Sequence, residues 1–184
     1  MKQMKTLRTN KIDAARRQTD AAIQLLFAGK DVFAVITLAS AAFRILRDFA
    51  EAKGNCEWHD SIKKIIQPGK ENDFWKAVNS SANFLKHADK DPDGILAIDC
   101  RAVDLCLSAC CWYYRSLGYE PTNEMKVLSA LIIIMYPDLL INDSARAQIL
   151  SNEVIDSIRK QPREESLSLC KDILKKLSGK GELF

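Results

Sequence analysis

The chain is poor in the residues that interrupt helices, with 7 glycines and 5 prolines among 184 residues. A sandwich or barrel of many short strands needs such residues at its turns, so their scarcity favours an all-α protein. No segment shows the alternation of apolar and polar side chains that is typical of a half-buried strand. The sequence therefore predicts an all-α, antiparallel helical bundle with a C-terminal helical extension.

Common catalytic and targeting signatures are missing as well. The chain contains no glycine-rich phosphate loop, no Gly-x-Ser-x-Gly turn around a nucleophile and no Cys-x-x-Cys pair. Its N-terminal residues are basic but lack the apolar run of a secretory signal, and the most apolar window, residues 127–135, is too short to cross a bilayer. We therefore expect a cytoplasmic protein that does not associate with membranes. A net charge of +3 is too small to indicate nucleic-acid binding by itself.

Six cysteines occur, at positions 56, 100, 106, 110, 111 and 170. Cys106 and Cys110 are four residues apart, so they share one face of a predicted helix, among leucines and alanines. In a cytoplasmic protein such thiols stay reduced, and a buried cysteine behaves as a small apolar residue. We therefore expect the cysteines to be buried.

Apolar residues recur at three- and four-residue steps through most of the chain, which predicts a series of helices. These cover residues 12–28, 31–53, 56–66, 72–87, 91–117, 122–135, 144–160 and 162–178. Hardly any residues separate the first two helices, so they should be antiparallel neighbours. The helix that begins at Asp91-Pro92 has few charges in its middle, so it should lie at the centre, with its aromatic residues (Trp112, Tyr113 and Tyr114) in the core. Residues 1–118 are expected to form the bundle, and residues 119–184 the extension packed on it.

One stretch, residues 79–94, combines one of the two histidines with the densest group of carboxylates. Asn79, Asn83 and His87 are spaced four apart, so their side chains follow one line along a helix. His87 can act as a general acid or base near neutral pH, and Asn83 can orient its ring or bind a phosphate or ribose oxygen. Asp89 can orient the imidazole. The candidate catalytic group is therefore His87, Asn83 and Asp89. The alternative is that His87 only interacts with the last carbonyls of its helix.

The arrangement of residues 12–117 resembles the HEPN superfamily of helical bundles: two long antiparallel helices, a helix that ends in a polar motif with histidine, and a further core helix. Active members of that family carry Arg-Asn-x-x-x-His, and many are metal-independent, dimeric ribonucleases. Asn83 and His87 match this motif, whereas Ala82 stands in the place of the arginine. The segment also resembles uncharacterised bacterial proteins that share a Lys-His-Ala-Asp-x-Asp-Pro signature.

The missing arginine decides which function the sequence favours. Arginine offers a permanently charged fork for phosphate, and Lys86 cannot replace it, because neighbouring residues on a helix point about 100° apart. Arg44 or Arg101 could supply the charge only from another helix. The favoured interpretation is a helical interaction module of unknown ligand without the full ribonuclease motif. The alternative is a metal-independent protein that cleaves or binds RNA through His87, so the sequence leaves enzymatic activity open.

The expected partners are a second copy of the chain and either RNA or another protein. The HEPN resemblance implies a homodimer. The apolar run at residues 131–134 points the same way, because it has too many apolar faces for a lone surface helix.

Two acidic or cysteine-containing motifs are candidate metal sites. Asp89-x-Asp91-x-Asp93-Gly94 matches the first half of a calcium loop, but Cys100 occupies the position where such a loop needs glutamate. Helix capping explains these residues better, with Asp91 as N-cap and Asp93 in the first turn. Cys56-x-x-His59, with Asp60, has no second pair of ligands. We therefore expect no metal and no cofactor, and keep a metal-binding bundle as the second alternative.

Overall fold

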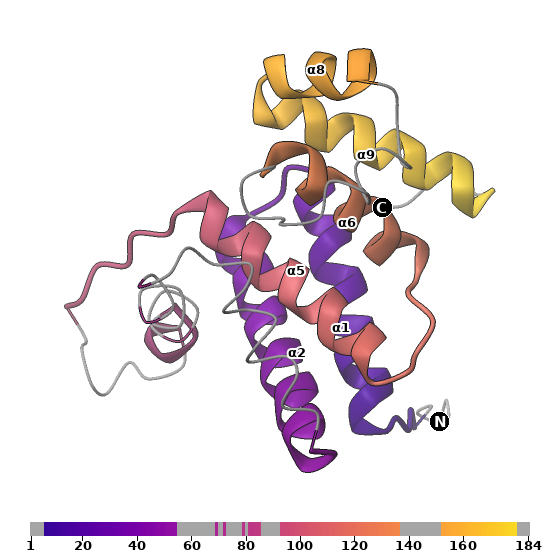
Figure 1. Cartoon of the computed structure of the whole chain (residues 1–184). Helices are drawn as coiled ribbons and strands as arrows, with labels where there is room; N and C mark the ends of the chain where they lie inside the picture. The colour runs from indigo at the N-terminus through magenta and orange to yellow at the C-terminus, as the bar shows by residue number, and fades with distance from the viewer. Residues whose placement is uncertain are drawn as a thin grey trace, which may run out of the picture.

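The structure is a computed structural model, and it describes residues 6–54, 69, 72, 79, 81–85, 93–136 and 152–179. All regular elements within these residues are helices, packed around one hydrophobic cluster. The predicted all-α helical bundle is thereby confirmed (Figure 1). Within the same residues, no helix is both long and apolar enough to span a membrane.

The bundle is built on an antiparallel pair, α1 (Lys11–Phe27) and α2 (Val32–Ala52). Gly29 makes the tight connection possible, because its φ of 62° lies in the left-handed region that other residues avoid. The Asp31 carboxylate then caps α2 by accepting a hydrogen bond from the backbone N–H of Ala34 at 2.9 Å. Fully buried alanines line both helices where they meet the core, so the helix axes can approach closely.

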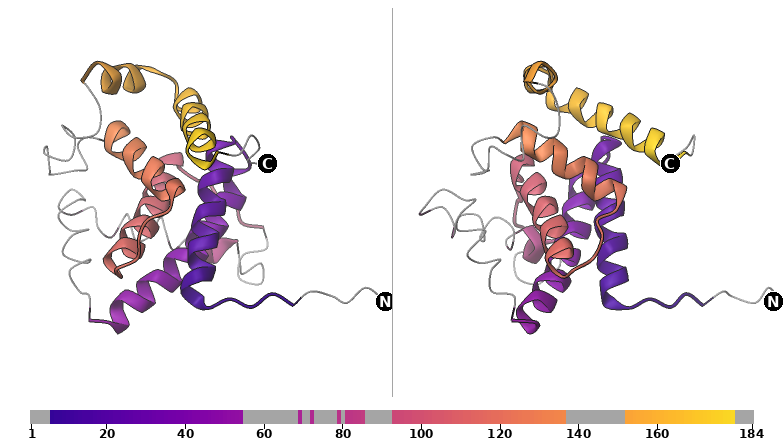
Figure 2. Two further views of the ribbon diagram at one scale, coloured as in Figure 1. Left: turned by 90° about the vertical axis from the view of Figure 1, so that its right-hand side faces the viewer. Right: turned by 45° about the vertical axis from the view of Figure 1, so that its right-hand side comes forward.

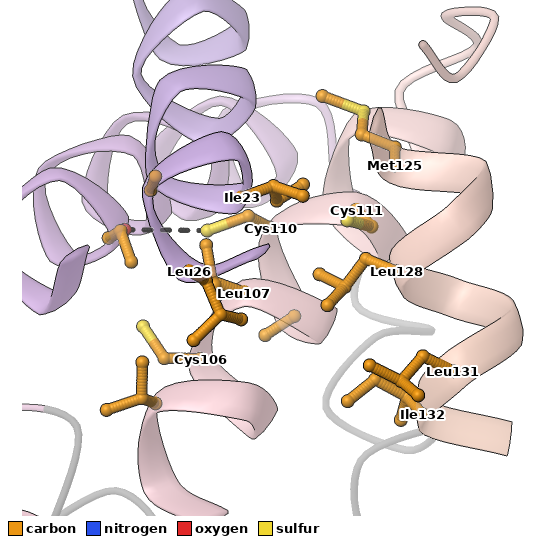
Figure 3. Packing of buried hydrophobic residues seen from close by; sticks show 14 of the residues in the cluster. Ile23, Leu26, Cys106, Leu107, Cys110, Cys111, Met125, Leu128, Leu131 and Ile132 are labelled. Carbon is orange, nitrogen blue, oxygen red and sulfur yellow. Dashed lines mark hydrogen bonds between the residues drawn. The ribbon is translucent and has the colours of Figure 1, made fainter. Parts of the chain in front are cut away.

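Helix α5 (Cys100–Ser116) crosses this pair and forms the centre of the core, as predicted. Its Cys110 thiol donates a hydrogen bond to the Ala39 carbonyl of α2 at 3.4 Å, because the small residues of α2 leave room at this point (Figure 3). Tyr113 is 1% exposed and packs edge-to-face on Phe43, with 5.6 Å between ring centroids. The expectation that Trp112 is in the core was wrong. Its side chain is 45% exposed.

Helix α6 (Asn123–Met135) packs on α1 and α5, and α8 (Asn152–Lys160) and α9 (Arg163–Ser178) lie across it (Figures 1 and 2). Leu131, Ile132 and Ile134 are therefore buried by neighbours in the same chain, at 4–5% exposure. These contacts within the chain account for the apolar run at residues 131–134 without a second copy of the chain. Buried side chains of α6, α8 and α9 belong to the same cluster as those of α1, α2 and α5. The division into two units at residue 118 stays a prediction.

The predicted start of α5 was wrong by eight residues. The helix begins at Cys100 rather than at Asp91-Pro92, and Asp99 is its N-cap, accepting a hydrogen bond from the backbone N–H of Arg101 at 2.8 Å. Residues 94–99 are not helical and run away from the bundle (Figure 1), and Ile95 is 95% exposed. A short helical turn is stable only when it packs on something, and of residues 94–99 only Ile98, next to α5, packs against the hydrophobic cluster. Asp91 and Asp99 are both suitable N-caps, and the helix begins after Asp99.

Several predicted elements lie partly or wholly outside the described residues. Helix 56–66 is one of them, and the predicted helix at 144–160 is described only from residue 152 onwards. Of the predicted helix at 72–87, residues 72, 79 and 81–84 are helical and Leu85 is a turn residue. Leu85 is half-buried and packs against the hydrophobic cluster, which places this segment on the bundle.

Proline substitution tests the revised start of α5. Ala97→Pro should change the free energy of unfolding by less than about 1 kcal/mol, because residue 97 is exposed and outside the helix. Ser108→Pro, in the interior of α5, should cost about 3 kcal/mol or more. Urea denaturation followed by circular dichroism measures both. Equal costs for the two variants would show that the helix does begin near Asp91.

Candidate functional site

The segment that carries the sequence-predicted site is described only in part. Asn83 lies on a helical turn and is exposed, whereas the preceding residue, Ala82, is 5% exposed. The two side chains point in different directions because successive helical residues are about 100° apart. His87 and Asp89 lie outside the described residues, so their grouping with Asn83 stays a prediction.

The described parts of the metal candidates do not form a ligand cage. Asp93 is exposed and precedes a non-helical segment, so its expected role in the first turn of a helix was wrong. Asp89 and Asp91 lie outside the described residues, as do Cys56, His59 and Asp60 (the second motif). No group of three His, Cys, Asp or Glu side chains that could hold a metal ion occurs within the described parts of the chain.

The strongest polar cluster in the described structure lies where α5, α6 and α9 meet. Asp104 of α5 is 2% exposed, and its carboxylate accepts hydrogen bonds from Nε (3.2 Å) and Nη2 of Arg163 at the start of α9. The hydroxyl of Tyr136, just after α6, donates to the same carboxylate at 2.6 Å. Burial and the charge of Asp104 raise the pKa of the Tyr136 hydroxyl, so it stays protonated as a donor. This three-residue group, the Asp104 clamp, ties α9 to the core.

A second cation lies beside the clamp. The guanidinium of Arg101 lies 5.4 Å from the centroid of the Tyr136 ring, within the range of a cation–π contact. Arg101 was one of the two arginines that the sequence suggested as a substitute for the missing family arginine. The other, Arg44, is exposed on α2.

Asp104 was not among the candidate site residues expected from the sequence. A signal was present: Asp104 lies next to Val103 and two residues before Cys106, on the apolar face of the helix. A carboxylate at such a position needs a buried partner. The partner is 59 residues away in sequence, so no local pattern identifies it.

A second polar seam joins α1 to the start of α6. Asp20 accepts hydrogen bonds from the Thr122 hydroxyl at 2.7 Å and from Nη1 of Arg16 at 2.9 Å. Burial raises the pKa of the Asp20 carboxyl. Next along α1, Asp13 forms ion pairs with Arg16 at 2.7 Å and Arg17 at 2.8 Å. Each polar group here has a partner within the chain, so the seam serves to align α1 with α6.

The described thiols are not arranged as nucleophiles. Cys106, Cys110, Cys111 and Cys170 are buried, which confirms the prediction for these four, and Figure 3 shows three of them among leucines and isoleucines. Burial raises the pKa of the thiols of Cys110 and Cys111, and raises that of Cys170 to about 12. Such thiols remain protonated at neutral pH and unreactive. The prediction was wrong for Cys100, which is exposed at the first position of α5.

Comparison with protein-family models, with curated proteins and with solved structures finds no match to this chain. The arguments for its function therefore depend on its own residues.

The Asp104 clamp gives the first prediction for this region. Arg163→Ala should lower the free energy of unfolding by about 2–4 kcal/mol, because it leaves a buried carboxylate with only the Tyr136 hydroxyl. Arg47→Ala is the matched control: Arg47 pairs with Asp48 and Glu51, which are both more than half exposed, so about 1 kcal/mol or less is expected. Urea denaturation at pH 7 measures the difference. Equal losses in the two variants would refute the clamp.

The raised thiol pKa values predict lower stability in alkali. A folded-state pKa above the unfolded value stabilises the protein below the unfolded pKa, near pH 9, and that contribution is lost as the pH rises towards about 12. Cys170→Ala should therefore weaken the fall in unfolding free energy between about pH 9 and pH 12, by up to about 1.4 kcal/mol per pH unit. Leu174→Ala, at a buried neighbouring position on α9, should lower stability but keep the wild-type slope. An unchanged slope in Cys170→Ala would contradict the prediction.

Proposed function

We propose that the chain is a HEPN-like helical interaction module that does not cleave RNA through Asn83 and His87. The observation that carries this proposal is the burial of Ala82, at the position of the family's catalytic arginine. An arginine at a site with 5% exposure would have to displace its neighbours or bury its charge. The motif therefore lacks its cation, and the position that would carry it is buried.

The pairing of the other polar groups agrees with a non-catalytic role. A catalytic acid or base is held ready for a substrate in an accessible cleft. In the described structure, Asp104 and Asp20 are instead occupied by arginine, tyrosine and threonine side chains of the same chain. These groups hold helices in register, and the buried thiols remain protonated. The described residues thus form a scaffold of helices, and Asn83 is exposed on it.

The proposed partner is another protein, including a second copy of this chain. The resemblance to dimeric HEPN proteins is now the argument for a homodimer, since α8 and α9 cover the apolar run at residues 131–134. RNA remains the alternative ligand, and its cleavage is the outcome that the following experiment is designed to detect.

The proposal predicts that the purified protein does not cleave RNA through His87. Wild-type protein, His87→Ala and Asn83→Ala are incubated with fluorescently labelled single-stranded RNA in EDTA, and the products are resolved on a denaturing gel. We expect no cleavage above that of a buffer control, and the same result for all three proteins. Cleavage by the wild-type protein that His87→Ala abolishes would overturn the proposal in favour of a metal-independent ribonuclease.

Two further variants make the result specific. His59→Ala removes the other histidine and controls for loss of any histidine. Ala82→Arg rebuilds the family motif, and we expect a lower melting temperature and no gain of cleavage, because residue 82 is buried. A stable Ala82→Arg protein that cleaves RNA would refute the argument from burial. Cleavage that occurs only when divalent metal replaces EDTA would instead support the metal-binding alternative.

A further inference from the structure

An open pocket of about 320 Å³ lies at the end of the bundle where α1 begins and α2 and α5 end. Its apolar surface comes from Ile12 and Phe49, and its aromatic wall from Tyr114 and Tyr119. Polar side chains of the first turns of α1 complete the lining: Asn10, Lys11, Asp13 and Arg16. The volume is at the low end of the range for small-molecule sites. The pocket is separate from the turn that carries Asn83, and its properties do not depend on the function proposed above.

The two rings of the aromatic wall pack on each other. The rings of Tyr114 and Tyr119 stack with centroids 5.1 Å apart and 27° between their planes. Tyr114 is 7% exposed and forms the fixed support, whereas Tyr119 is 38% exposed. A partly exposed ring that is held from behind can offer its edge to a further aromatic ring, since edge-to-face pairs are favourable.

The charges at the pocket favour an anion. Asp13 is the acidic residue of the lining, and it is neutralised by its ion pairs with Arg16 and Arg17. Lys11 is exposed and forms no ion pair with any described residue. A second exposed lysine without such a partner, Lys53, holds its ammonium 6.0 Å from the centroid of the Tyr119 ring. An anionic group beside Tyr119 would therefore meet two lysines that have no other counter-ion in the described structure.

We propose that this pocket binds a small aromatic carboxylate, with its ring between Tyr119 and the apolar surface of Ile12 and Phe49, and its carboxylate towards Lys11 and Lys53. The apolar surface favours a hydrocarbon or indole ring over a nucleobase. The polar edge of a nucleobase would lose its hydrogen bonds to water against Ile12 and Phe49, which offer no side-chain donor or acceptor in return. The ligand class thus follows from the pairing of lysines with an apolar, aromatic-walled pocket.

Titration with indole-3-acetate as the probe tests the proposal. The full chain, labelled with 15N, is titrated and the amide shifts are followed by NMR. We expect saturable shifts centred on residues 10–16, 49, 114 and 119, with a Kd on the order of 1 mM, as suits a ligand of this size. Tyr119→Ala should weaken binding about three- to ten-fold, and Lys11→Gln about two- to five-fold. Raising the salt concentration should weaken binding by the wild-type protein.

Matched variants at the opposite end of the α1–α2 pair are the controls. Phe33→Ala removes another exposed aromatic ring and Lys30→Gln another exposed lysine, and both should bind the probe as the wild-type protein does. Cyclohexylacetate should bind more weakly than indole-3-acetate, because it lacks a planar ring. Absence of saturable shifts at the pocket, or equal weakening by Tyr119→Ala and Phe33→Ala, would overturn the proposal. Tighter binding of adenosine monophosphate than of indole-3-acetate would show that the ligand class is a nucleotide.

Discussion

The structure depends on the burial of α5. This helix places apolar and aromatic side chains on most of its circumference, so it is stable only where other helices cover it. The antiparallel pair α1–α2 covers one side, with small residues that let Cys110 reach the Ala39 carbonyl. Helix α6 covers another side, and α8 and α9 in turn cover α6. The other helices thus lie where they cover the apolar faces of α5 and α6.

The same burial creates an electrostatic requirement. Asp104 enters the core with α5, and an ionised carboxylate that is 2% exposed needs compensation. Arg163 and Tyr136 supply it from two other elements, so the position of α9 is set by a charge as well as by apolar contact. This arrangement turns the C-terminal helices into a continuation of the core. Arg163 and Tyr136 are residue types that often bind ligands, but here both are paired with Asp104.

Polar groups in the described structure are of two kinds, those paired within the chain and those left unpaired. The clamp and the α1–α6 seam are satisfied internally, and the side chain of Ala82 is buried. The open pocket beside Tyr119 has the opposite character, because Lys11 and the neighbouring Lys53 form no ion pair within the described structure and the Tyr119 ring is partly exposed. A site that binds a ligand is expected where the fold leaves interactions unmade.

The helices and most of their ends could be predicted from the sequence. The three- and four-residue spacing of apolar side chains predicts α1, α2, α6 and α9 to within about two residues, because that spacing is a local property of a helix with one face in a core. The start of α5 could not be predicted this way, since Asp91-Pro92 and Asp99 are both good caps. A helix that began at Asp91 would include residues 94–99, which make little contact with the hydrophobic cluster, so the helix begins after Asp99 instead.

The sequence by itself determined the fold class, the central place of α5 and the absence of an arginine beside Asn83. Only the tertiary structure decided that position 82 is buried, that Asp104 is held by Arg163, and that Tyr119 and Lys53 lie beside the start of α1. The physical reason is the separation along the chain over which each interaction acts. Helix periodicity and capping act between residues a few positions apart, whereas ion pairs, ring stacking and burial join residues whose distance along the chain carries no signal.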